Sequence, residues 1–123
     1  MSIRSILIID DEPNICVLLE KFFKREGYKA YSAHHAEEAF KIIHTHHPDV
    51  IFLDIKLPEI DGIDILKTIK KISPEAIIVM ISGHATENTA RDSLYLGAFE
   101  YINKPIDLER VKELMAQIEV SKF

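Results

Sequence analysis

The stretch IFLDIKLPEIDG, residues 51–62, joins a buried-looking strand to a carboxylate and a turn. Val50–Leu53 is apolar and rich in β-branched and aromatic residues, which favours a strand, and Asp54 ends it abruptly. The Pro, Asp and Gly residues that follow are typical of a loop. Apolar residues then recur at helical spacing, at Ile63, Leu66 and Ile69. The stretch therefore predicts a strand, a loop and an amphipathic helix in immediate succession.

The same unit recurs along the chain, because short apolar runs alternate with amphipathic segments five times. The runs are Ile6–Ile9, Ala30–Ala33, Val50–Leu53, Ile77–Ile81 and Phe99–Ile102. The first, third and fourth runs are apolar almost throughout, as parallel strands covered on both faces require. The second run is the weakest, and we expect it at an edge of the sheet.

Helical periodicity fills the segments between these runs. Pro13 is expected in the first turn of the first helix and Gly27 at its end. A fourth helix should run from about Thr86 to Leu96, and Asp107 is a candidate N-cap of the fifth. The inward-facing residues are Ile15, Leu18, Leu19, Phe22 and Phe23 in the first helix, Ala36, Ala39, Phe40 and Ile43 in the second, and Leu108, Val111, Leu114, Met115 and Ile118 in the last. Strict strand–helix alternation predicts a three-layer α/β/α sandwich around a parallel sheet.

Composition places residues 1–123 in one globular domain. A net charge of −5 gives no electrostatic reason to expect binding to nucleic acid or to an anionic membrane. The single cysteine, Cys16, excludes an intrachain disulfide and is expected to be a buried residue of the first helix. No run approaches the ~18 apolar residues of a membrane span, and we predict a soluble, cytoplasmic protein.

Polar residues follow four of the five predicted strands, at the edge where open parallel sheets bind ligands. They are Asp10, Asp11 and Glu12, then Asp54, then Ser82 and Gly83, and finally Asn103, Lys104 and Pro105. A few carboxylate oxygens without Cys or His favour Mg²⁺, which often binds a phosphate as well. Lys104 and Ser82 can then contact a transferred phosphoryl group, with Asp54 as its nucleophilic acceptor.

Each of these residues alone also has an ordinary structural explanation. Acids at strand ends are common N-caps and turn residues, so Asp10 or Glu12 can simply cap the first helix. Ser82 with Gly83 is an ordinary turn, and an isolated Lys104 is an ordinary surface lysine. Complementary chemistry at four strand ends is hard to obtain from turn preferences. The set as a whole therefore favours phosphoryl transfer.

Four motifs, in this order and spacing, resemble the receiver domain of two-component response regulators. They are IIDDEP, FLDIKLPEIDG, ISGHA and YINKP, which begin at residues 8, 52, 81 and 101. The resemblance covers essentially the whole chain, and residues 81–111 are especially similar to receivers of NtrC-type transcription activators. It implies a flavodoxin-like fold, with five strands in the order 2-1-3-4-5 flanked by five helices.

The resemblance assigns the chemistry of the site. It implies that Asp54 accepts a phosphoryl group from a sensor histidine kinase or a histidine phosphotransfer protein. Asp11, Asp54 and the backbone carbonyl of Lys56 would bind Mg²⁺ directly, and Asp10 mainly through water. Ser82 and Lys104 would contact the acyl phosphate.

The resemblance also implies a conformational switch and a backbone geometry. Tyr101 stands at the aromatic switch position, which moves inward when Ser82 moves toward the phosphate. The peptide bond between Lys104 and Pro105 is expected to be cis. Leu57 replaces the methionine that is commonest at its position, a nearly volume-conserving change.

Two further residues stand at positions that vary in the family. Lys56 and His84 are expected to overlook the phosphoryl group and to set the lifetime of the acyl phosphate. The direction of their effect stays open, because Lys56 can either stabilise the phosphate charge or block the attacking water.

The predicted function is a phosphorylation-controlled switch and not an enzyme that turns over a substrate. Mg²⁺ would support only autophosphorylation and autodephosphorylation. The output would be a change at the face of the fourth helix, fifth strand and fifth helix, which includes Tyr95, Tyr101 and Ile106, acting on an output domain or a downstream protein. Phosphorylation-dependent dimerisation stays open, as does the choice between a stand-alone regulator and a receiver of a larger protein.

Other function classes fit less well. Phosphatases with an aspartyl-phosphate intermediate typically need a second Asp two residues after the nucleophile, where this chain has Lys56. No glycine-rich phosphate loop follows a strand, which disfavours a flavin or nucleotide domain. The full set of acids, hydroxyl and lysine disfavours a degenerate receiver. His44 and His47 share a helix face, but a transition-metal site needs further ligands and a second shell, and none is evident.

Overall fold

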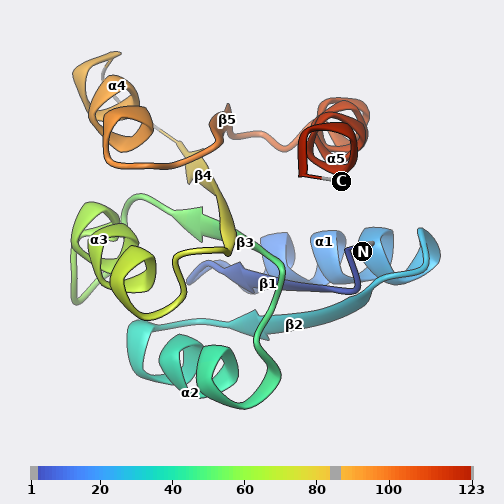
Figure 1. The fold of residues 1–123 in the computed structure, drawn as a ribbon, viewed down its shortest axis with the longest axis horizontal. Coiled ribbons are helices and arrows are strands. Elements are labelled where there is room, and N and C mark those ends of the chain that lie inside the picture. The colour runs from blue at the N-terminus through green and yellow to red at the C-terminus, as the bar shows by residue number, and fades with distance from the viewer. Residues whose placement is uncertain (1–2, 84–86, 123) are drawn as a thin grey trace.

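The computed structural model describes residues 3–83 and 87–122, and within these residues five strands alternate strictly with five helices (Figure 1). The elements are β1 (Ser5–Ile9), α1 (Pro13–Arg25), β2 (Lys29–Ala33), α2 (Ala36–His46), β3 (Val50–Asp54), α3 (Gly62–Ile72), β4 (Ile77–Ser82), α4 (Glu87–Tyr95), β5 (Glu100–Asn103) and α5 (Leu108–Lys122). Among the described residues, no helix is both long and apolar enough to cross a membrane.

The five strands form one parallel sheet in the order β2-β1-β3-β4-β5. This confirms the predicted strand order and the predicted edge position of β2. Every residue of β1 and β3 is buried, which explains why these strands are apolar on both faces. The register pairs Ile9 of β1 with Leu53 of β3, so the carboxyl ends of these two strands lie side by side.

Two apolar cores cover the faces of the sheet, and together they make the three-layer sandwich that the sequence predicts. Residues of α1 and α5 pack on one face, and residues of α2 and α3 on the other. In Figure 1, α4 lies on the same side as α3, and α5 lies on the side of α1. The inward-facing residues of α5 from Val111 to Ile118 are buried as predicted.

Two details differ from the sequence prediction. The buried face of α1 is centred on Cys16, Leu19 and Phe23, so Leu18 lies at its rim and is 38% exposed. The sequence shows a wide apolar stripe on this helix but does not show which edge of the stripe packs against the core. The fifth strand is Glu100–Asn103, and Phe99 precedes it with partial exposure. The predicted start of the fourth helix at Thr86 lies outside the described residues. The predicted cap of the fifth helix is confirmed, because the Asp107 side chain accepts from the backbone N–H of Glu109.

Gly62 lets α3 begin directly against the end of β3. Its N–H donates to the carbonyl oxygen of Ile55 at 2.8 Å, and Asp61 caps the helix by accepting from the N–H of Ile63. A Cβ at position 62 would lie 2.6 Å from the backbone oxygens of Asp54 and Ile55. These neighbours are backbone atoms, which cannot rotate away. Any side chain here must move the helix away from Asp54 or distort the backbone that carries it.

We expect Gly62→Ala to lower the free energy of unfolding by roughly 1–3 kcal/mol, the usual effect of overpacking. Gly83→Ala is the matched control, because a Cβ there would meet only the Lys104 Cδ at 3.8 Å, an ordinary van der Waals contact. Urea unfolding of both variants measures the difference. Equal stabilities of the two variants would contradict the close packing around residue 62.

Candidate functional site

Three carboxylates meet at the carboxyl end of the sheet. Asp54 is the last residue of β3, and Asp10 and Asp11 follow β1 directly. One oxygen from each lies within 4.8 Å of the others. Asp10 and Asp54 are buried, whereas Asp11 is exposed. The parallel register of β1 and β3 explains this convergence, as the sequence predicts.

The backbone fixes the direction of the two buried carboxylates. Oδ1 of Asp10 accepts from the N–H of Glu12 at 2.9 Å, and Oδ1 of Asp54 accepts from the N–H of Lys56 at 3.0 Å. Both contacts join an Asp side chain to the N–H two residues later, as in an Asx turn. Among the described residues, the buried Oδ2 of Asp10 has no hydrogen-bond partner, although Lys104 Nζ lies 3.2 Å away.

Lys104 places one ammonium among the acids. Its Nζ lies 2.9 Å from Glu12 Oε1 and 3.2 Å from Asp54 Oδ2, and its side chain is only 15% exposed. The backbone N–H of Lys104 donates to the carbonyl oxygen of Ser82 at 2.7 Å, which ties the residue to the end of β4. The peptide bond between Lys104 and Pro105 is cis. Although burial opposes it, hydrogen bonding to Glu12 and Asp10 raises the pKa of the Lys104 ammonium.

Negative charge nevertheless remains in excess at this edge of the sheet. Burial, together with repulsion from Asp54, raises the pKa of Asp10 from its usual 3.8 to about 6. The Glu12 N–H and the Lys104 ammonium oppose this shift only in part. Crowded carboxylates, one of them with a buried oxygen that accepts no hydrogen bond from the described residues, are suited to a hard divalent cation, and oxygen-only ligands favour Mg²⁺. The residues present therefore fit the predicted metal.

An open cleft of about 610 Å³ gives access to these groups. Its lining includes Asp11, Asp54 and Lys104, with Ile15 and Pro105 as apolar neighbours. Lys56 and Gly83 also line the cleft. A small anionic group can thus reach Asp54 from solvent while contacting the ammonium of Lys104.

The remaining predicted site residues lie in different places. Ser82 is buried at the end of β4, and its neighbour Gly83 lines the cleft. Tyr101 of β5 is half-buried and packs against the core under α2 and α3. Lys56 is exposed and lines the cleft. His84 lies outside the described residues.

Glu12 is the contact that sequence reasoning missed. It stands at the N-cap position of α1, but its side chain makes no capping hydrogen bond and instead pairs with Lys104. Glu12 therefore occupies the N-cap position, but the interpretation that its side chain caps the helix is wrong. The sequence does show a third acid immediately after Asp11. It does not show the pairing of this acid with Lys104, because the two residues are 92 positions apart.

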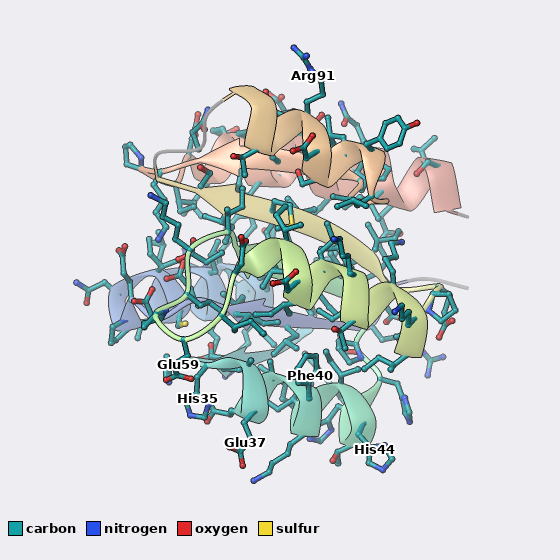
Figure 2. All side chains as sticks on the ribbon, turned by 90° about the vertical axis from the view of Figure 1, so that its left-hand side faces the viewer. His35, Glu37, Phe40, His44, Glu59 and Arg91 are labelled. Atoms are coloured by element: carbon teal, nitrogen blue, oxygen red, sulfur yellow. The ribbon has the colours of Figure 1, made fainter. Side chains whose placement is uncertain are left out.

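The histidines among the described residues do not form a comparable cluster. His35 and His44 project outward from the region of α2 (Figure 2), and the ring of His46 stacks on that of Tyr31 at 4.2 Å. In the described part of the chain, the one set of three or more potential ligands within reach of a single ion is Asp10, Asp11 and Asp54.

Comparison with known proteins adds a family context to this geometry. A family model described as the response regulator receiver domain matches residues 6–116. The chain is 42% identical over 110 residues to the nitrogen assimilation regulatory protein NtrX of Azorhizobium caulinodans, a match that covers 88% of this chain and 24% of the relative. It is 33% identical over 110 residues to sporulation initiation phosphotransferase F of Bacillus subtilis, with 89% of each chain covered.

Further matches point the same way. The transcriptional regulator NtrC of Proteus hauseri is 32% identical over 115 residues, which cover 94% of this chain and 24% of the relative. The solved receiver domain of NtrX from Brucella abortus has a TM-score of 0.85 and 36% identity, with 91% of this chain and 95% of that chain covered. This chain thus spans about a quarter of the length of the curated relatives NtrX and NtrC.

The raised pKa of Asp10 predicts a pH-dependent contribution to stability. The folded protein holds a proton on Asp10 up to about pH 6, whereas the unfolded chain releases it near 3.8. Between these values the folded state binds more protons, so Asp10 lowers the free energy of unfolding as pH rises. In metal-free buffer, the stability of wild type relative to Asp10→Asn should therefore fall between about pH 4 and pH 6.

Urea unfolding across this pH range measures that difference. Asp92→Asn, at an exposed position in α4, is the control and should show no comparable trend relative to wild type. A wild-type advantage over Asp10→Asn that stays constant or grows with pH would contradict the assigned environment of Asp10.

Proposed function

The chain belongs to the family of response regulator receiver domains, and we propose that its Asp54 accepts a phosphoryl group from a phosphohistidine. The relatives NtrX and NtrC confirm the predicted resemblance to receivers of NtrC-type activators. One observation carries the proposal: Asp54 shares a solvent-accessible cleft with Asp11, while Lys104 Nζ lies 3.2 Å from its Oδ2. The donor would be a sensor histidine kinase or a histidine phosphotransfer protein.

The acidic cluster would hold Mg²⁺ during this reaction. Asp11 and Asp54 would bind the ion directly, together with the backbone carbonyl of Lys56, and Asp10 mainly through water. The buried Oδ2 of Asp10, which has no hydrogen-bond partner among the described residues, supports this assignment. When bound, Mg²⁺ supplies positive charge that offsets the charge of the phosphoryl oxygens.

The residues of the chain would then carry out the transfer. A carboxylate oxygen of Asp54 attacks phosphorus and forms the new P–O bond, while the P–N bond of the donor breaks and its electron pair stays on the imidazole nitrogen. The Lys104 ammonium donates to a phosphoryl oxygen and offsets its charge. The hydroxyl of Ser82 donates to another phosphoryl oxygen, and the buried position of Ser82 at the end of β4 is consistent with this role.

The phosphorylated site would act as a switch through the adjoining strands. Ser82 ends β4 and Lys104 follows β5, so both proposed phosphate contacts lie next to the strand that carries Tyr101. Tyr101 would move inward with Ser82 and change the face of α4, β5 and α5, on which Tyr95 is 91% exposed. Phosphorylation can shift this equilibrium only by stabilising one conformation more than the other.

The output of the switch would lie outside this chain. Because the chain spans about a quarter of NtrX and NtrC, we propose that it controls an output domain or a separate downstream protein. A phosphorylation-dependent dimer is one form that such control can take. The proposed location is the cytoplasm, where a kinase can deliver phosphoryl groups.

The first test is chemical phosphorylation. Incubation of wild type with Mg²⁺ and phosphoramidate or acetyl phosphate should add one phosphoryl group, seen by intact-mass analysis. Asp54→Asn should gain none, because the amide lacks the nucleophilic carboxylate. Asp92→Asn, at an exposed position in α4, should behave as wild type.

The result can fail in two informative ways. An unmodified wild type would contradict Asp54 as a phosphoacceptor, and equal labelling of Asp54→Asn would place the reactive group elsewhere. Chelation of Mg²⁺ should abolish labelling, and labelling that survives chelation would contradict the metal assignment alone.

A second test concerns the lifetime of the acyl phosphate. Lys56 lines the cleft and is exposed, so replacement by alanine should change the rate at which the phosphorylated protein loses its phosphoryl group. His84→Ala should also change this rate. Lys67→Ala, an exposed lysine on α3, is the control. Rates for Lys56→Ala and His84→Ala within error of wild type would contradict the tuning role.

A further inference from the structure

The shortest ion pair at the site involves a residue outside the set of proposed metal ligands and phosphate contacts. Glu12 Oε1 lies 2.9 Å from Lys104 Nζ, whereas the nearest oxygens of Asp10 and Asp54 lie 3.2 Å from it. The Glu12 side chain is 57% exposed, in contrast to the buried carboxylates of Asp10 and Asp54. Lys104 is therefore held between two buried acids and one acid at the surface.

The loop places Glu12 in this position. Its N–H donates to Oδ1 of Asp10, and Pro13 follows at the start of α1. An N-cap side chain such as that of Asp commonly accepts from the backbone of the helix, but the side chain of Glu12 does not. Its carboxylate contacts Lys104 instead, across 92 residues of chain. The preference for this partner makes Glu12 more than a solvated surface acid.

The hydrogen-bonding capacity of Lys104 limits what it can contact at one time. An ammonium group has three N–H donors, and Glu12, Asp54 and Asp10 all accept from Lys104. A phosphoryl group on Asp54 replaces the charge of that carboxylate and adds new acceptors, so Lys104 must redistribute its contacts among the phosphoryl oxygens, Asp10 and Glu12. Loss of the contact to Asp10 would leave a buried carboxylate with less compensation, which is unfavourable. Glu12 can be hydrated by water, so of the two acids that keep their charge it is the one whose contact with Lys104 is more readily released.

We propose that Glu12 is a positioning residue that holds Lys104 in the unphosphorylated protein and competes with the phosphoryl group for its ammonium. Glu12 thereby lowers the stability of the phosphorylated state. This inference rests on the proposed function, because it requires Lys104 to contact a phosphoryl group on Asp54.

Two substitutions separate this contact from a general effect of charge. Glu12→Gln removes the negative charge and weakens the pairing with Lys104. Glu12→Asp keeps the charge but shortens the side chain by one methylene, so its carboxylate no longer reaches Nζ at 2.9 Å. Glu59→Gln is the control for loss of an exposed acid elsewhere, in the loop between β3 and α3 (Figure 2).

The first measurement uses metal-free protein and nuclear magnetic resonance. Exchange of the Lys104 ammonium protons with water should be faster in both Glu12 variants than in wild type, since each loses the shortest contact of Nζ. Glu59→Gln should match wild type. Unchanged exchange in both Glu12 variants would show that Glu12 does not hold Lys104, and would overturn the inference whatever happens at Asp54.

The second measurement uses beryllofluoride, a phosphoryl mimic that binds aspartate carboxylates, at a fixed Mg²⁺ concentration. Glu12→Gln and Glu12→Asp should each bind it roughly two- to fivefold more tightly than wild type, as expected for release of one partly exposed ion pair. If Glu12→Gln binds beryllofluoride more tightly but Glu12→Asp binds it with wild-type affinity, the effect is charge repulsion. That outcome would overturn the competition.

The outcomes distinguish this inference from the proposed function. Tight binding by wild type with no gain in either Glu12 variant would overturn the competition and leave Asp54 as phosphoacceptor. Failure of wild type itself to bind beryllofluoride or to be labelled would overturn the proposed function, and the competition with it.

Discussion

The repulsion between the buried carboxylates of Asp10 and Asp54 is the constraint on which this site depends. β1 and β3 are adjacent and buried along their whole length, so the two carboxylates cannot move apart without disturbing the centre of the sheet. Backbone N–H groups fix one oxygen of each, and Lys104 offsets only part of the charge. The fold therefore maintains an unfavourable charge distribution that a cation, a proton or a rearranged lysine can relieve.

This constraint explains why much of the fold and the acidic site could be predicted from the sequence. Strands buried on both faces must be apolar throughout, and that pattern stands out in Ile6–Ile9 and Val50–Leu53. Once the strands are parallel, the residues after them must share an edge, so Asp10 and Asp54 converge whatever the details of packing. Prediction was weaker where burial is one-sided, as at Leu18 on the rim of α1 and at the start of β5.

The sequence does not determine which acid Lys104 contacts. The sequence places Lys104 at the correct edge, but several acids are then within reach of a long side chain. Which acid it contacts depends on the loop geometry around Glu12, which is set by the hydrogen bond from Glu12 N–H to Asp10 and by Pro13. The position of Glu12 before the first helix allowed a helix cap, but its side chain pairs with the Lys104 ammonium instead.

The difference in burial among the acids gives each a different kind of role. A buried carboxylate such as Asp10 exchanges partners at a high free-energy cost, because water cannot replace a lost contact. An exposed carboxylate such as Glu12 exchanges partners cheaply, so its contact with Lys104 adjusts an equilibrium without supporting the fold. Under the proposed function, the buried acids would make the site reactive, and substitutions at the exposed acid would alter the persistence of the phosphorylated state while leaving the architecture intact. Regulation of lifetime would then reside at the rim of the cleft, because only there can a contact be lost without leaving a buried charge unpaired.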